Sequence, residues 1–208
     1  MNVKLDSLAS VVGDVSRETF ERLEHLETFL TKWAMRINLV SRSTLPQLWE
    51  RHVLDSAQLL PIARGANKWI DLGSGSGFPG LVVATFLRPH DGSVVLVESN
   101  LKKAAFLRTA IVELALPARV EAARIEDVRL PAQPPDIVSA RALAPLPQLL
   151  ELSYPLMGAD TRAVFHKGRG YAAEVRDSLG AWDYQLTAHP SRTQADSVIL
   201  EISHVRKR

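Results

Sequence analysis

Residues 69–80 read Trp-Ile-Asp-Leu-Gly-Ser-Gly-Ser-Gly-Phe-Pro-Gly, and this glycine-rich stretch is the strongest indication of the fold. An apolar pair is followed at once by an acid, Asp71, and then by Gly73, Gly75 and Gly77 at every second residue. A further apolar run comes directly after the stretch. A buried strand that turns through glycines into a helix is typical of a nucleotide-type cofactor cradle. The stretch therefore predicts an α/β fold with a cofactor site at the end of its first strand.

The position of the glycines separates two classes of cofactor. Residues 75–80 satisfy the dinucleotide pattern G-x-G-x-x-G, but two residues later than a pyrophosphate site requires, and Pro79 removes an amide from the helix start. The alternative pattern, acid-x-Gly-x-Gly-x-Gly, suits S-adenosylmethionine, because Asp71 at the strand end can take the ammonium group. Glu98, after the apolar run 94–97, can accept the ribose hydroxyls of either cofactor. Asp71 and the strand count favour S-adenosylmethionine.

Short β-rich runs alternate with helical runs from residue 68 onward, which indicates a mostly parallel sheet with helices on both faces. Two segments near the C-terminus alternate apolar and polar residues with no room for a helix between them. They predict a hairpin, so one strand must run antiparallel. We expect seven strands, at 69–72, 94–98, 120–122, 137–140, 163–166, 182–187 and 198–205, and helices at 80–87, 101–116, 146–156 and 172–179.

Two helices are expected before the first strand. Apolar residues recur at spacings of three and four over 16–37, with Ser16 as the N-cap. A second helix is expected over 45–60, with Pro61 as its stop. We therefore divide the chain into an N-terminal helical extension, 1–64, packed on a core domain that carries the cofactor site.

The composition excludes several classes of protein. Cysteine is absent, which removes disulfides, thiolate metal sites and cysteine nucleophiles. The six histidines are scattered, so we expect no metal. No run approaches the roughly 18 apolar residues of a membrane span, and the first ten residues lack a signal-peptide pattern, so we expect a cytoplasmic protein. A net charge of +2 permits an anionic partner.

S-adenosylmethionine donates a methyl group, and the residues at the end of the fourth expected strand indicate which kind of acceptor would receive it. The chain reads Val138-Ser-Ala-Arg-Ala-Leu-Ala-Pro145, without the Asn/Asp-Pro-Pro-aromatic cluster of many amino-group methyltransferases. Arg141 stands in its place and suits a guanine edge or a phosphate, with a structural ion pair as an equal alternative. Guanine N7 carries a free lone pair. Methyl transfer to it therefore needs positioning, which we assign to Arg141, and no general base.

Blocks spread over residues 30–170 give a specific resemblance. They include Ile37-Asn-Leu-Val-Ser41, Arg51-His-Val-Leu-Asp-Ser56 and the glycine stretch through Gly80. In these blocks the chain resembles the bacterial ribosomal RNA small subunit methyltransferase G family, also called glucose-inhibited division protein B. The resemblance implies a class I, Rossmann-like S-adenosylmethionine-dependent methyltransferase domain over 65–208, acting on N7 of guanine 527 in 16S ribosomal RNA. A methyltransferase for another RNA or for a small molecule is the alternative.

The resemblance also implies residue roles and partners. Family cofactor contacts carry over onto Gly73, Phe78 and Arg141, and onto Ile125 and Glu126, which would flank the adenine. The 30S ribosomal subunit is the expected partner and a monomer the expected state. The expected S-adenosylmethionine site comprises Asp71, Gly73, Gly75, Gly77, Phe78, Glu98, Ile125, Glu126 and Arg141.

Basic and polar side chains on the N-terminal helices and after the fifth strand are the candidate RNA contacts. Neutralisation of phosphates by the basic groups predicts binding that weakens with salt. A buried pair of Arg51 or His52 with Asp55 is an alternative to RNA contact. The candidates are Arg36, Asn38, Arg42, Arg51, His52, Lys167 and Arg169.

Overall fold

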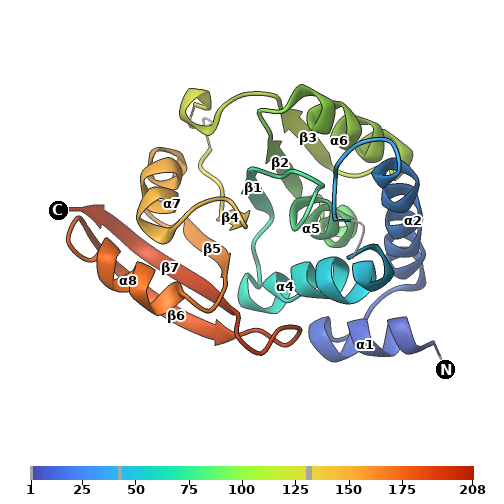
Figure 1. Ribbon diagram of the computed structural model, residues 1–208, viewed down its shortest axis with the longest axis horizontal. Helices are drawn as coiled ribbons and strands as arrows, with labels where there is room; N and C mark the ends of the chain where they lie inside the picture. The colour runs from blue at the N-terminus through green and yellow to red at the C-terminus, as the bar shows by residue number, and fades with distance from the viewer. Residues whose placement is uncertain (1, 42–43, 130–132) are drawn as a thin grey trace.

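The computed structural model describes residues 2–41, 44–129 and 133–208, so the candidate Arg42 lies outside the described residues. Its centre is a seven-stranded sheet in the order β3-β2-β1-β4-β5-β7-β6 (Figure 1). Neighbours among β1 to β5 pair in parallel, and β7 pairs antiparallel with both β5 and β6. The expected sheet with one antiparallel strand is confirmed. The strands are β1 Lys68–Leu72, β2 Ser93–Val97, β3 Ala118–Glu121, β4 Ile137–Arg141, β5 Arg162–Lys167, β6 Trp182–Pro190 and β7 Val198–Lys207.

Helices cover both faces of the sheet. Those that follow the strands are α5 Gly80–Leu87, α6 Leu101–Glu113, α7 Leu146–Ser153 and α8 Tyr171–Ser178, with the short turns η3 Arg88–His90, η4 Ile125–Asp127 and η5 Tyr154–Leu156. Successive strand residues face opposite sides, so in β1 Trp69 packs with α5 and α6 while Ile70 and Leu72 pack with α7. The sheet therefore separates two apolar cores.

The N-terminal extension contains more pieces than expected. They are α1 Val3–Val12, α2 Arg17–Ala34, η1 Leu45–Gln47, the π-helical η2 Trp49–Leu54, α3 Asp55–Ala57 and α4 Leu59–Ile62. The expectation of two helices is wrong, because α1 also forms, with the Asn2 side chain accepting from two backbone amides and Leu8 fully buried. The expected Ser16 N-cap of α2 is confirmed, since its hydroxyl accepts from the Thr19 amide.

The second expected helix is present but broken between residues 45 and 62. Pro61 does not stop it, because α4 continues to Ile62. Pro61 is the third residue of α4, where a helix leaves the amide without an intrahelical partner, so its missing N–H costs little there.

The N-terminal segments and the sheet share one apolar core. Leu8, Leu23 and Trp49 belong to the same buried cluster as Leu81 of α5 and Phe106 of α6. Figure 1 shows α1, α2 and α4 on the flank of the sheet that α5 and α6 cover, away from α7 and α8. The extension thus packs on the core, while its boundary near residue 64 stays a prediction. No helix of the described segments has both the length and the apolarity to span a membrane.

Candidate active site

The glycine loop lies at the carboxyl end of β1 and is tied to the end of β2. Gly75 has a φ of 55° and donates its amide to Glu98 Oε2 at 2.8 Å, while the Asn100 amide donates to Oε1 at 2.7 Å. A Cβ on Gly75 would meet only the Gly73 carbonyl oxygen, at 3.6 Å. The left-handed backbone explains the glycine, and the space above it is open. The Glu98 carboxylate therefore fixes this loop, the platform of the site, to the end of β2.

Asp71 lies beneath this platform. Only 1% of the residue is exposed, and its Oδ1 accepts a hydrogen bond from the Ser139 hydroxyl at 2.8 Å. Burial raises the pKa of Asp71 to about 6, although the Ser139 and Ser74 hydroxyls partly offset the shift. Oδ2 faces the first turn of α5 and has no well-formed hydrogen bond. In this structure the carboxylate ties β1 to β4 through Ser139, and its contact with a cofactor ammonium stays a prediction.

Arg141, at the end of β4, is fixed by three hydrogen bonds. Its Nη1 donates to Asp55 Oδ2 and to the Arg51 carbonyl oxygen, both at 3.1 Å, and its Nη2 donates to His52 Nδ1 at 2.6 Å. The guanidinium carbon lies 5.5 Å from the centre of the Phe78 ring, on which His52 stacks at 5.0 Å. Three of the five N–H donors of an arginine are thus used by the protein. The guanidinium is held as a nearly immobile group.

Asp55 joins three distant parts of the chain. Its Oδ2 pairs with Arg141, and its Oδ1 accepts from the Thr193 hydroxyl at 2.8 Å and from Gln58 Nε2 at 3.1 Å. His166 of β5 contacts the Asp55 carbonyl oxygen at 2.9 Å through Nε2. The register places His166 opposite Arg141 on one face of the sheet. Both therefore meet the extension at the same carboxylate.

Both histidines of this cluster are neutral near pH 7. Burial, and then the positive charge of Arg141, lower the pKa of His52 to about 4. Burial also lowers the pKa of His166, against the opposing effect of Asp55. His52 Nδ1 accepts from Arg141, so its proton is on Nε2, which is buried without a hydrogen-bond partner. The positive charge facing Asp55 therefore comes from Arg141 alone.

A cavity of about 310 Å³ opens beside Arg141 at the carboxyl ends of β4 and β5. Ligands of open parallel sheets bind at this edge, outside the carboxyl ends of the strands. Its volume is at the lower end of the range for small-ligand sites, about 300–1,000 Å³. The cavity is lined by Thr44, Arg51, His52, Asp55, Arg141, Ala142, His166, Lys167, Gly168, Gln194 and Ser197.

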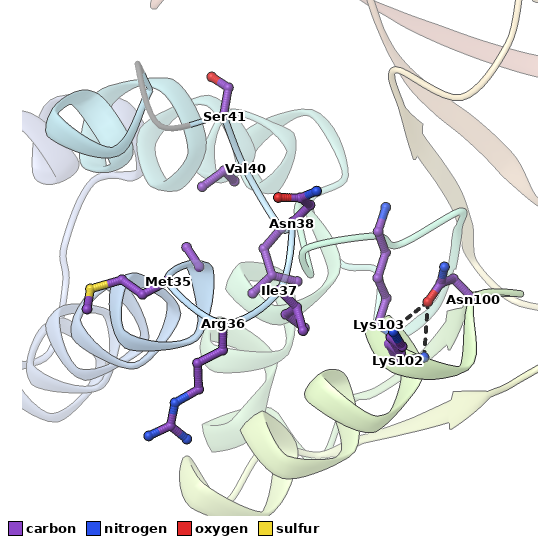
Figure 2. A pocket seen from close by; sticks show the side chains of 11 residues that line it. Met35, Arg36, Ile37, Asn38, Val40, Ser41, Asn100, Lys102 and Lys103 are labelled. Carbon is purple, nitrogen blue, oxygen red and sulfur yellow. Dashed lines mark hydrogen bonds between the residues drawn. The ribbon is translucent and has the colours of Figure 1, made fainter.

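The candidate RNA contacts fall into separate groups. His52, Arg51 and Lys167 line the cavity beside Arg141. Arg36 and Asn38 instead line a second cavity of about 740 Å³ between the segment after α2 and the start of α6. In Figure 2, Asn38 and Lys103 lie on facing sides of this space, Arg36 points away from it, and Asn100 caps α6. The structure thus brings three of the described candidates to Arg141 and leaves the others apart.

Strand alternation explains where Lys167 lies. As the neighbour of His166 it faces the other side of the sheet, where its ammonium pairs with Glu174 and donates to the Ala144 carbonyl oxygen at 2.9 Å. Arg169 is 84% exposed and pairs with Asp196. Lys167 is therefore a buried tie to α8, whereas Arg169 is a surface group.

Ile125 and Glu126 occupy the short turn η4 after β3, with Ile125 half-buried and Glu126 exposed. Sequence reasoning did not identify Gln58, Thr193 or His166 as parts of the site. The parity of β5 could have found His166, but nothing in the sequence indicates that residue 193 lies near residue 55. In the described residues no group of three or more His, Asp or Glu side chains could hold a metal ion.

The chain matches the family model described as rRNA small subunit methyltransferase G over residues 19–195. A protein of Chelativorans sp. strain BNC1 named ribosomal RNA small subunit methyltransferase G is 50% identical over 208 residues, which are 100% of this chain and 99% of that protein.

Solved structures with low sequence identity share the fold. A TehB-like SAM-dependent methyltransferase from Corynebacterium glutamicum aligns with a TM-score of 0.57 and 14% identity, over 87% of this chain and 98% of that chain. A mutant of MtNAS in complex with S-adenosylmethionine aligns with a TM-score of 0.58 and 15% identity, over 96% of this chain and 83% of that chain. The expected class I methyltransferase fold is confirmed.

Proposed function

The chain belongs to the rRNA small subunit methyltransferase G family, and we propose that it transfers a methyl group from S-adenosylmethionine to N7 of guanine 527 in 16S ribosomal RNA. The observation that carries this proposal is the full-length match to the Chelativorans protein. In this chain, the acid, the three glycines and Arg141 lie at the carboxyl ends of the neighbouring strands β1 and β4. The acceptor atom and its position follow from the family resemblance of the sequence blocks.

The residues at the glycine loop fit S-adenosylmethionine. Gly75 leaves open space above a fixed loop, and Glu98 keeps unused lone pairs on both oxygens after accepting from two amides. Ile125 offers a half-buried apolar side chain for the adenine. The cofactor, when bound, supplies an electrophilic methyl group on a sulfonium. We assign Gly73, Gly77 and Phe78 to the same cradle.

No general base is needed for attack by guanine N7, so the task of the protein is to place and orient the base. Arg141 suits this task because Asp55, His52 and the stack on Phe78 immobilise its guanidinium. A fixed group loses no further freedom when the acceptor binds, and orientation can supply about 7–11 kcal/mol of a barrier in favourable cases. We assign Arg141 to positioning, with Arg51 and His52 beside it.

The wider assignments rest on the same proposal. The substrate is 16S ribosomal RNA, presented as the 30S subunit, and the enzyme works as a cytoplasmic monomer. Asn38, Lys102 and Lys103 line the larger cavity, so this cavity would hold RNA phosphates at some distance from the target base, with Arg36 pointing away from it on the same segment. Residues 1–64 form the extension and 65–208 the catalytic domain.

The proposal is tested with purified protein, S-adenosylmethionine and 30S subunits from a strain that lacks this gene. Borohydride and aniline treatment cleaves RNA at N7-methylguanine, so a new cleavage at guanine 527 is the expected result. Methyl transfer to a different nucleotide would favour another RNA substrate. The absence of any methylated RNA, with S-adenosylmethionine bound, would overturn the proposal.

A further inference from the structure

The cavity beside Arg141 has a wall that the sequence did not reveal. The loop between β6 and β7, residues 191–197, contributes Gln194 and Ser197 to its lining. We propose that this cavity receives the target guanine and that Gln194 is the residue that distinguishes guanine from adenine in it. This inference rests on the proposed function and names the part of the site that selects the base.

The loop that carries Gln194 is rigidly attached. The Thr193 hydroxyl donates to Asp55, and the Arg192 amide donates to Gln58 Oε1 at 2.5 Å. Arg192 Nη1 also donates to the Ser10 carbonyl oxygen at the end of α1, at 2.9 Å. The loop is thus fastened to the extension and to the carboxylate that holds Arg141. A loop fixed in this way can hold a polar side chain at a defined position relative to a bound ligand.

Gln194 has hydrogen-bonding capacity that the protein leaves unused. Its Oε1 accepts from the Ser197 hydroxyl at 3.3 Å, whereas its Nε2 makes no hydrogen bond to any part of the chain that the structure describes. Gln194 Nε2 is accessible, in contrast to His52 Nε2 and His166 Nδ1, which are enclosed by protein atoms and have no partners. An accessible amide donor in the wall of a cavity can pair with an acceptor on a polar ligand.

The other donors in the wall are engaged in part. Arg141 uses three of its N–H groups on protein atoms, and Lys167 is paired with Glu174. Asp55 has no free role either, because both of its oxygens accept hydrogen bonds. Arg141 keeps two N–H groups and the exposed Arg51 keeps its guanidinium, and Gln194 adds an unused donor on a half-buried neutral amide.

The chemistry of the base decides what such a donor would select. On the edge that carries N7, guanine presents the O6 acceptor, whereas adenine presents the N6 amino donor at the same place. In the proposed pose, a base that directs N7 toward the methyl donor turns O6 of guanine, or N6 of adenine, toward the part of the wall that carries Gln194. A donor from Gln194 pairs with O6 of guanine and opposes the amino group of adenine. Enzymes that modify a base take the target nucleotide out of the stack and bind the base in a pocket.

The experiment measures base preference without requiring methyl transfer. Protein saturated with S-adenosylhomocysteine, which fills the adenosine site, is titrated with the 5′-monophosphates of guanosine, inosine and adenosine by calorimetry. Inosine keeps O6 and N7, so it should bind like guanosine, and adenosine should bind roughly 5- to 150-fold more weakly. The phosphate and ribose are common to all three and cancel in the ratio.

Two variants separate the donor from the rest of the side chain. Gln194→Leu should abolish the preference, and Gln194→Glu, which keeps the acceptor for Ser197 but loses the donor, should turn it toward adenosine. Gln148→Leu, the same substitution at an exposed position of α7, is the matched control and should leave it unchanged. Affinity for S-adenosylhomocysteine and the unfolding midpoint should stay constant in all three variants.

The outcomes distinguish this inference from the proposed function. No binding of guanosine monophosphate at millimolar concentration, or a preference that survives in both Gln194 variants, overturns the inference even if guanine 527 is methylated. A Gln194-dependent preference in a protein that does not methylate 30S subunits would retain the guanine pocket and overturn the proposed function instead.

Discussion

The pairing of Asp55 with Arg141 gives a prediction that can be worked through in numbers. The two side chains are 7% and 15% exposed, and Asp55 also accepts from Thr193 and Gln58. Replacing one member of a buried ion pair leaves a charge without compensation and costs about 3–5 kcal/mol. Asp55→Asn, which keeps the shape, and Arg141→Met, which removes the charge, should each lower the free energy of unfolding by about 3 kcal/mol.

The double variant carries the argument. Once Asp55 is an amide, the loss of the guanidinium removes a group that no longer has its counter-charge, so the second substitution should cost much less than the first. We expect a coupling energy of about 2 kcal/mol, within the range of about 0.5–3 kcal/mol for groups in one network. Urea unfolding of the four proteins, followed by tryptophan fluorescence and far-UV circular dichroism, provides the cycle.

The exposed pair of Lys207 and Glu151 is the control, because both side chains are about half exposed and the same cycle should give only about 0.2–1 kcal/mol. Strict additivity of the Asp55 and Arg141 variants would contradict this expectation. It would mean that the ion pair contributes no coupling energy to stability and that Arg141 is held mainly by His52 and Phe78. Arg141→Met should also abolish methyl transfer, which the stability loss alone would not explain at low temperature.

Three further outcomes depend on single residues. Burial raises the pKa of Asp71 from 3.8 to about 6, so the folded state binds this proton more tightly than the unfolded state does. The free energy of unfolding should therefore fall by up to about 3 kcal/mol as the pH rises from about 4 to about 6. Asp71→Asn should lack this pH dependence of stability, and an unchanged dependence would contradict the assignment. Burial lowers the pKa of His52 from 6.5 to about 4, so the unfolded state binds that proton more tightly and stability is lost as the pH falls through this interval; His52→Gln should remove the loss, measured in the same titration. Gly75→Ala should cost about 1–3 kcal/mol of stability and weaken the binding of S-adenosylmethionine at least tenfold, measured by calorimetry. Gly65→Ala, also at positive φ but remote from the loop, should cost stability alone. Equal affinities of the two variants for S-adenosylmethionine would argue against the cradle.

The sheet was largely predictable because its signals are local. The strand runs, the turn through glycines and the hairpin pattern of 182–205 each depend on neighbouring residues. The missed helix α1 also had a local signal, since Asn2 is a good N-cap and Leu5, Leu8 and Val12 recur at helical spacing. A short amphipathic segment ending at Gly13 was there to be found.

The site was predictable only in part, because its contacts are non-local. The sequence singles out Arg141 and allows two roles for it, ligand contact or an ion pair; the structure contains the ion pair, with Asp55. The partners of Asp55 proved to be Arg141 and His166 rather than Arg51, whose side chain is exposed. Hydrophobic periodicity says which face a residue occupies, but it does not say which distant segment comes to meet it.

The strand order has a consequence for the way this chain is assembled. β7 follows β6 along the chain, yet it lies between β5 and β6, so β6 has no strand to pair with until β7 has been added. The loop that contacts Asp55 hangs from these same two strands. During synthesis on a ribosome, the cofactor edge of β1 and β2 emerges long before this loop does. A chain synthesised in this order should form its methyl-donor site before its acceptor site is complete. Its selectivity for the substrate should arise only when β7 pairs with β5 and completes the sheet.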